Sequence, residues 1–260
     1  MRFSCCTWAL SGSPHHVLGQ LAAVGFRWID IQPSALRTPA DQALARRLGL
    51  AVSCIGLSFG VPVGAALDHP EEEARRRALA AMDDALAHAA HLGAETAYVI
   101  PGLDAGRAAL ARFATSIRWL AELAAQRRIR LAIEHFPGRA LPTIAGTLDF
   151  LHAVDHPNFG LLLDIGHAQM SGESAAQAVA DAGPSLSYVH LDDNDGAGDL
   201  HWALLDGVLT RENLAAVFAA LRATGYQGGV SLELSPALAD PLDAIVRSWR
   251  VVQQVVSVPE

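Results

Sequence analysis

The sequence predicts a single-domain (β/α)8 barrel of the TIM type that spans residues 1–260. Short apolar runs, typical of strands buried on both faces, alternate eight times with segments of helical periodicity. Strict alternation of strand and helix implies parallel strands joined by right-handed crossovers, and 260 residues suffice for eight such units in a closed barrel. An open, doubly wound sheet is the alternative, but no Gly-x-Gly-x-x-Gly motif follows the first strand.

In the first half of the chain, the expected strands are short and apolar, and the second one alternates around Trp28. They are Phe3–Thr7, Phe26–Gln32, Leu50–Leu57 and Thr96–Ile100. The helices between them begin at polar or proline-containing caps and stop at glycines. They run from Ser11 to about Val24, from Thr38 through Leu48, and from His69 to about Leu92. The segment Ser58–Asp68 is rich in glycine and proline and is therefore predicted to be a loop.

In the second half, four further apolar runs are expected to form strands, and three of them end in or near a carboxylate. They are Arg130–Glu134, Phe159–Asp164, Leu186–Leu191 and Gly229–Leu234. The accompanying helices are predicted from helical periodicity, from capping residues and from stops at Gly183-Pro184 and Gly225. They are Ala105–Gln126, Thr143–Val154, Ser174–Ala182, Arg211–Thr224 and Pro241–Val255.

Composition and charge narrow the classes of function. The net charge of -8 argues against a broad nucleic-acid-binding surface, which needs an excess of basic residues. All 19 basic residues are arginines, which excludes lysine Schiff-base, pyridoxal phosphate and Walker-type phosphate-loop chemistry. Cys5, Cys6 and Cys54 form no Cys-x-x-Cys pair, and the N-terminus lacks the apolar region of a secretory signal. No apolar run is long enough to span a bilayer, so we expect a cytoplasmic protein.

Four consecutive strands carry a metal-binding residue type near their carboxyl ends. These residues are Glu134, Asp164, His190 and Glu233. The carboxyl ends of barrel strands meet at one rim, and buried charges of one sign cluster around a cation. Each residue alone has another interpretation; Asp164, for example, could cap the helix that follows it. Together they predict one divalent ion, and oxygen-rich ligation with one histidine suits Mn, Mg, Co or Zn.

A second group of candidate ligands is expected close by. His167 follows Asp164 by three residues, and Asp199-Leu-His201 lies in the glycine-rich loop after the seventh strand. Alternate residues of an extended loop can face one side, so Asp199 and His201 could close on a second ion together with His167. The alternative, which we favour, is that these three groups bind substrate hydroxyls or support the metal ligands.

Five motifs make the chain similar to the xylose isomerase-like barrel superfamily, the sugar phosphate isomerase/epimerase group to which endonuclease IV is related. They are Leu131-Ala-Ile-Glu134, Leu163-Asp164-Ile-Gly-His167, Val189-His190-Leu-Asp192-Asp193-Asn194, Gly198-Asp199-Leu-His201 and Leu232-Glu233. The C-terminal half carries this resemblance, whereas the N-terminal half matches only by its barrel pattern. The resemblance implies a single divalent ion held by Glu134, Asp164, His190 and Glu233. It also implies that Glu134 and Glu233 flank the substrate and move protons.

The implied reaction is isomerisation or epimerisation of a sugar, a sugar phosphate or a related keto-polyol. The ion would polarise the substrate carbonyl and stabilise an enediolate, while carboxylates remove and return a proton. A dehydratase of a keto-cyclitol or of dehydroshikimate is an alternative, because the same intermediate permits loss of a β-hydroxyl. A non-catalytic metal-binding barrel also stays open, as does assembly into a homo-oligomer. The expected partner is a small sugar or polyol, without nucleic acid or membrane.

The chain departs from two patterns within this superfamily. An endonuclease IV-like phosphodiester hydrolase needs two further histidines, and the corresponding places here are Ser58 or Phe59 and Ile100. Many epimerases of the group carry an arginine soon after the strand-seven histidine, and none stands there in this chain. Arg139 is the best remaining cation for a substrate phosphate or carboxylate, although a surface loop position is equally compatible with the sequence. Trp202 is expected either to form a wall of the pocket or to pack in the loop.

Overall fold

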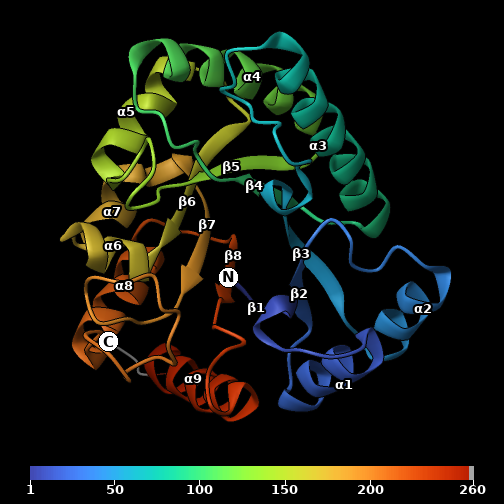
Figure 1. The fold of residues 1–260 in the computed structure, drawn as a ribbon. Helices are drawn as coiled ribbons and strands as arrows, with labels where there is room; N and C mark the ends of the chain where they lie inside the picture. The colour runs from blue at the N-terminus through green and yellow to red at the C-terminus, as the bar shows by residue number, and fades with distance from the viewer. Residues whose placement is uncertain (258–260) are drawn as a thin grey trace.

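The computed structural model describes residues 1–257 and shows a closed barrel of eight parallel strands surrounded by helices (Figure 1). Each strand pairs with the next one in sequence order, and the first strand closes the ring by pairing with the eighth. The strands are β1 Arg2–Cys6, β2 Trp28–Ile31, β3 Ala51–Gly56, β4 Thr96–Val99, β5 Arg130–Glu134, β6 Phe159–Asp164, β7 Leu186–Leu191 and β8 Gly229–Leu232. The predicted barrel fold is confirmed.

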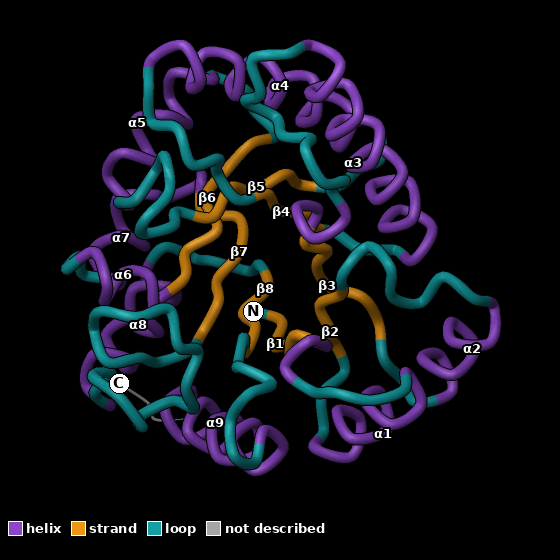
Figure 2. The backbone as a smooth tube through the Cα atoms, viewed as in Figure 1, coloured by secondary structure: helices purple, strands orange, loops and turns teal. Residues whose placement is uncertain are grey.

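The helices form the outer layer, as the tube view shows most plainly (Figure 2). They are α1 Pro14–Val24, α2 Pro39–Arg47, α3 Glu72–Leu92, α4 Arg107–Gln126, α5 Ile144–Val154, α6 Ile165–Ser171, α7 Ala175–Ala182, α8 Arg211–Ala223 and α9 Pro241–Val256. Each follows its strand in the predicted order, except that two helices, α6 and α7, follow β6. None of the helices within residues 1–257 is both long and apolar enough to cross a membrane.

Helix boundaries follow local capping chemistry. Ser13, Thr38 and Thr143 each accept a hydrogen bond from the backbone N–H three residues later, which satisfies one free donor of the first turn. Helix α3 begins at Glu72 rather than at the expected His69. The reason is that His69 Nδ1 accepts a hydrogen bond from the backbone N–H of Glu71, ahead of the first helical turn.

The inside of the barrel holds polar as well as apolar side chains. Its apolar part is a small cluster separate from the large core between the sheet and the helices. This cluster consists of Cys54, Tyr98, Ala132, Leu162 and Tyr188. The Tyr188 hydroxyl donates a hydrogen bond of 2.7 Å to Asp30 Oδ1, and it lies 2.9 Å from Ser4 Oγ and 2.8 Å from Ser53 Oγ. A buried hydrogen-bonded network therefore lies directly under the carboxyl rim.

Two details at that rim differ from the sequence expectation. Strand β8 ends at Leu232, so Glu233 is the first residue after the strand; its backbone N–H still donates to Leu191 O at 3.1 Å. Helix α6 starts directly after β6 and was not among the predicted helices. Its seven residues are too few to show a helical repeat, and its cap is Asp164, the last residue of the strand itself.

Candidate metal centre

The four strand-end residues predicted to bind a metal lie together at the carboxyl rim. Each offers one ligand atom, and these four atoms all lie within 4.8 Å of one another. At most 7% of the surface of any of them is exposed. The strand register explains part of this convergence, because Asp164 and His190 lie opposite each other in the β6–β7 pair. The residues are Glu134, Asp164, His190 and Glu233.

The candidate ligand atoms of this group lie close together, but they do not provide a complete set of hydrogen bonds for one another. His190 Nδ1 lies 2.5 Å from Glu233 Oε2, 3.4 Å from Glu134 Oε1 and 4.0 Å from Asp164 Oδ2. Three carboxylates thus compete for one imidazole nitrogen, and Asp164 Oδ2 has no hydrogen-bond partner. Three buried carboxylates around one imidazole are costly to hold without a cation. The set suits a divalent ion in both number and chemistry, so the group is a candidate metal site.

Burial and charge set the protonation of these groups. Burial raises the pKa of Glu134 above its ordinary value. Burial also disfavours the carboxylate of Glu233, but the charge and hydrogen bond of His190, together with His201 and Trp8, outweigh this effect and lower the pKa of Glu233 to about 2. Burial disfavours a charged His190 as well, yet the neighbouring carboxylates, Glu233 foremost, hold its pKa well above the ordinary value. The imidazole thus carries the positive charge that a divalent ion would replace.

The two carboxylate oxygens of Asp164 make different contacts. Oδ1 accepts a hydrogen bond of 2.8 Å from the backbone N–H of His167 and so caps α6, whereas Oδ2 faces the other ligand atoms. Both interpretations of Asp164, helix cap and candidate metal ligand, are therefore compatible with the geometry. Gly166 allows the tight packing here, because a Cβ at that position would lie 2.3 Å from Asp192 Oδ1. The Gly166 N–H donates to that same oxygen at 2.9 Å.

The second predicted cluster also comes together, around one carboxylate. Asp199 Oδ1 lies 3.2 Å from His167 Nε2 and 3.0 Å from His201 Nε2. The other nitrogen of each ring is engaged too: His167 Nδ1 lies 2.9 Å from the backbone oxygen of His135, and His201 Nδ1 lies 2.9 Å from Asp192 Oδ2. Burial lowers the pKa of His167, but Asp164 and Asp199 together raise it to about 10. The arrangement suits a polar contact for substrate, and it also offers three ligand types to an ion.

The loop after β7 uses its acidic residues to hold its own shape. Asp193 accepts hydrogen bonds from the backbone N–H groups of Gly207 at 2.7 Å and Leu209 at 2.9 Å. Asp193 and Trp202 also form a backbone bridge. His201, next to this bridge, adopts a left-handed φ of 47°, which is unusual for a residue with a side chain. The acidic run that replaces the epimerase arginine thus fixes His201 in place.

A cavity of about 350 Å³ opens over the two clusters. It is lined by members of both clusters, by Arg139, and by residues in or directly after strands of the first half of the chain, namely Trp8, Ser58, Phe59, Tyr98 and Ile100. Trp202 is not among the lining residues, so the structure does not bring it to the cavity. Arg139 packs over the Phe136 ring at 4.9 Å and donates from Nη1 to Pro101 O at 3.3 Å.

Trp8 is a site residue that the sequence interpretation did not identify. Its indole N–H donates a hydrogen bond of 2.9 Å to Glu233 Oε1, and its ring packs against Phe59 with centroids 5.2 Å apart. The available signal was its position directly after the first predicted strand, at the rim where barrel sites are built. The N-terminal half showed no motif, so the position of Trp8 alone did not indicate a function for this residue.

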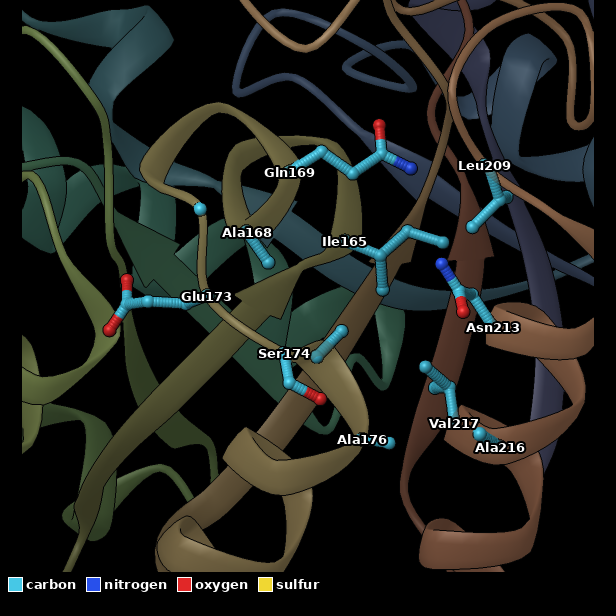
Figure 3. Close-up of a pocket in the computed structure, with 12 residues that line it drawn as sticks. Ile165, Ala168, Gln169, Glu173, Ser174, Ala176, Leu209, Asn213, Ala216 and Val217 are labelled. Carbon is cyan, nitrogen blue, oxygen red and sulfur yellow. The ribbon is translucent and has the colours of Figure 1, made fainter.

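A second hollow of about 350 Å³ lies on the outside of the barrel, among α6, α7 and α8 (Figure 3). The polar groups on its α6–α7 side serve local structure. Glu173 turns away from the other lining side chains in Figure 3 and accepts hydrogen bonds from the N–H groups of Ile144 and Ala145, while Ser174 caps α7. Because no group of ligand atoms converges there in the described residues, the rim is the candidate site.

Comparison with known proteins adds a family match. A family model described as "Xylose isomerase-like TIM barrel" matches residues 18–253. A D-allulose 3-epimerase structure from Methylomonas sp. superimposes with a TM-score of 0.83, covering 98% of each chain at 20% sequence identity. At that identity the superposition supports the fold.

Two curated relatives are similar over shorter segments. The L-ribulose 3-epimerase of Methylomonas sp. strain DH-1 is 30% identical over 155 residues, which cover 58% of this chain and 51% of the relative. The 3-dehydroshikimate dehydratase of Bacillus anthracis is 30% identical over 89 residues, which cover 34% of this chain and 32% of the relative. The matches thus span about half the length of these relatives or less.

Proposed function

The chain belongs to the xylose isomerase-like TIM barrel family, and within it we propose a divalent-metal-dependent isomerase or epimerase of a sugar, sugar phosphate or related keto-polyol. The observation that carries this proposal is the convergence of carboxylates from β5, β6 and the end of β8 on the Nδ1 atom of His190 inside a buried site. The curated relatives of the chain include an epimerase and a dehydratase, which supports the proposal.

Four residues of this chain would hold the ion: Glu134, Asp164, His190 and Glu233. When bound, a divalent ion supplies Lewis-acid polarisation of a carbonyl next to a hydroxyl-bearing carbon. The protein's own groups do the proton transfer. Glu134 and Glu233 both reach the cavity from strands that are separated by β6 and β7, so one carboxylate can remove the α-proton and the other can return one. Epimerisation needs both groups, whereas aldose–ketose isomerisation can use one.

The surrounding residues orient this pair. Trp8 fixes one oxygen of Glu233 through its indole N–H, which leaves Oε2 beside His190. His167 is held by the backbone oxygen of His135 and by Asp199, so its position next to a substrate hydroxyl is set before substrate enters. Phe136, which packs 4.3 Å from the His167 ring, limits water on that side.

The first experiment is elemental analysis of protein purified without chelator or affinity metal, followed by a screen of ketoses in deuterated water. We expect about one Mn, Mg, Co or Zn ion per chain and deuterium incorporation at the carbon next to the carbonyl of a converted sugar. Protein that binds no ion, even after each metal is added back, would contradict the proposal. Bound metal with no deuterium incorporation from any ketose would favour the non-catalytic alternative.

One observation favours a second candidate, a dehydratase of an anionic keto-cyclitol. Arg139 lines the cavity, uses one donor on Pro101 O, and forms no ion pair with any carboxylate in residues 1–257. A guanidinium with free donors is suited to a carboxylate or phosphate on the substrate. Parallel assays with L-ribulose and 3-dehydroshikimate separate the two candidates. Water loss from 3-dehydroshikimate, seen as an absorbance change of the conjugated product, would establish the dehydratase, and deuterium exchange into L-ribulose the epimerase.

Phosphodiester hydrolysis is the least supported of the activities considered. The cavity wall at the places where an endonuclease IV-like site needs two more histidines is formed by Ser58, Phe59 and Ile100. The Ser58 hydroxyl is occupied by a hydrogen bond from the Ile100 N–H at 3.0 Å. These residues offer no nitrogen ligand, and the net charge of -8 disfavours a DNA backbone.

A further inference from the structure

Beneath the metal ligands lies a carboxylate that the proposed reaction does not use. Asp30, in β2, has no exposed surface. Its Oδ1 accepts a hydrogen bond of 2.7 Å from the Tyr188 hydroxyl. Its Oδ2 lies 3.8 Å from the Cys6 thiol and 3.9 Å from His190 Nε2. A fully buried carboxylate without a close cation is expensive, so its location next to His190 calls for a reason.

The His190 ring is held so that its two nitrogens face different groups. The rings of Tyr98 and Tyr188 meet it edge-on, with centroids 5.3 Å and 5.7 Å away. Nδ1 faces the three carboxylates of the candidate metal site, whereas Nε2 lies on the side of Asp30. Nε2 is buried and makes no hydrogen bond in this geometry.

We propose that Asp30 is a positioning residue of the metal centre, which accepts the Nε2 proton of His190 and so keeps the Nδ1 lone pair free for the ion. This inference rests on the metal-dependent function proposed above. A histidine that binds a metal through Nδ1 carries its remaining proton on Nε2, and that proton needs an acceptor in a dry interior. Asp30 Oδ2 becomes that acceptor when the 3.9 Å separation shortens by about 1 Å.

The groups around Asp30 are compatible with its role as an acceptor. The Tyr188 hydroxyl donates to Asp30 Oδ1, and the hydroxyl groups of Ser231 and Ser4 also interact with this carboxylate. The surrounding hydroxyl groups can all donate to Asp30, and its Oδ2 lies on the side of the imidazole. The carboxylate, imidazole and ion then form the chain of contacts that commonly orients metal-bound histidines.

A competing explanation is that Cys6, Asp30 and His190 bind an ion of their own. Their ligand atoms also lie within 4.8 Å of one another. This arrangement would require one imidazole to bind two cations, with both of its ring protons removed. This alternative and a positioning role for Asp30 predict different results. A separate ion site predicts two ions per chain, and the loss of one of them when Asp30 is replaced.

The test is the Mn2+ affinity of the full-length protein, measured by competition with a chelator. In Asp30→Asn the amide oxygen can still accept from Tyr188, so the NH2 group turns toward His190 and favours the tautomer with the proton on Nδ1. We expect about 10- to 100-fold weaker Mn2+ binding with the stoichiometry of one retained. The matched control is Ser53→Ala, which removes a neighbour of Tyr188 but leaves the carboxylate; its affinity should stay within about twofold of wild type.

The second measurement is made on the wild-type protein, and a variant is needed only to assign the signals. In 15N-histidine-labelled wild-type protein loaded with Zn2+, the His190 signals, identified by their loss in His190→Gln, should show the proton on Nε2 and the ion on Nδ1. Unchanged Mn2+ affinity in Asp30→Asn, or an ion on Nε2, would overturn this inference while leaving the metal-dependent function intact. Two ions in wild type with one lost in Asp30→Asn would make Asp30 a ligand instead. Wild-type protein without any ion would overturn the proposed function itself.

Discussion

The two halves of the barrel rim carry different chemistry. The ends of β5 to β8 supply three carboxylates and an imidazole, all buried and facing one point. The ends of β1 to β4 supply mainly aromatic, hydroxyl and aliphatic groups, namely Trp8, Ser58, Phe59, Tyr98 and Ile100. In Figure 1 the two sets of strands form opposite parts of one continuous ring.

This difference indicates a division of labour across the rim. In the function proposed above, the charged half would bind an ion and move protons, whereas the aromatic half gives the cavity its shape. The halves are linked at two points: Trp8 donates to Glu233, and Asp30 faces His190. Trp8, which follows β1, and Asp30, in β2, thus contact the charged groups without belonging to the candidate ligand set. Substitutions in the two halves are therefore expected to have different effects.

The largest effect is expected from Asp164, compared as Asp164→Asn and Asp164→Ala. Asn caps helices about as well as Asp but removes the charge, whereas Ala removes both functions. Both variants should lose more than about 100-fold in Mn2+ affinity together with turnover, since a ligand is lost rather than its support. Only Ala should also lose about 1 kcal/mol of unfolding free energy in the ion-free state. Urea unfolding with added EDTA measures that term. Wild-type metal binding by Asp164→Asn would remove this residue from the ligand set.

Glu233→Gln tests proton transfer in the charged half. We expect exchange of the substrate's α-hydrogen with deuterated water to fall by about 10²- to 10⁴-fold, because Gln cannot accept the proton. Metal content is determined on the same sample, so that a loss of exchange with the ion still bound identifies the proton-transfer role. Exchange at the wild-type rate would exclude the two-carboxylate mechanism.

The variants Arg139→Gln and Arg139→Lys test whether the cavity also binds an anionic group of the substrate. With 3-dehydroshikimate or a sugar phosphate as substrate, we expect KM to rise by about 10- to 100-fold in Gln, because charged hydrogen bonds are lost. Lys should recover only part of the loss, since it cannot form a bidentate pair. With L-ribulose, which is neutral, both variants should match wild type. Equal KM changes for neutral and anionic substrates would show that Arg139 supports the cavity wall instead.

Trp8→Phe tests the link from the aromatic half. Phe keeps an aromatic ring next to Phe59 but removes the N–H that donates to Glu233. We expect a decrease of about 10-fold in kcat with little change in KM, since the lost bond orients a reacting carboxylate. The comparison variant Phe59→Leu alters the same stack without touching a polar contact. If it lowers kcat as much as Trp8→Phe does, packing rather than the hydrogen bond is responsible.

The smallest effect is expected from Glu173, a carboxylate that already has partners. Burial alone would raise the pKa of Glu173, but the N–H groups of Ile144 and Ala145 lower it below its ordinary value of 4.5. The stabilisation is therefore present above pH 4.5 and is lost as the pH falls through the lower folded-state pKa. Glu173→Gln should cost less than about 1 kcal/mol at pH 7. The gap to wild type should shrink in urea titrations at acidic pH, and a pH-independent gap would contradict this account.

The sequence predicted those structural features whose signal lies within a few consecutive residues, and it missed those that depend on remote residues. The strands and the four rim residues were predictable, because an apolar run that ends in Glu134 or Asp164 is readable within six residues. Helix α6 was missed since its cap belongs to the preceding strand. Trp8 and Asp30 were missed because their partners are remote: Trp8 and Glu233 are separated by 225 residues. Strand order in a closed barrel brings β1 next to β8, but it does not reveal which side chains then meet.

Helix α6 has a consequence for how ion binding can be observed. Seven residues form too short a helix to persist on their own, so α6 depends on its packing and on the cap from Asp164. The other oxygen of the same carboxylate faces the candidate metal site, so an ion bound there would share this residue with the helix. Occupancy and local helix opening are therefore linked, and the backbone amide of His167, which is bonded to Asp164, is the natural reporter. Its hydrogen–deuterium exchange should slow on metal loading, which would measure the occupancy of the site without a substrate.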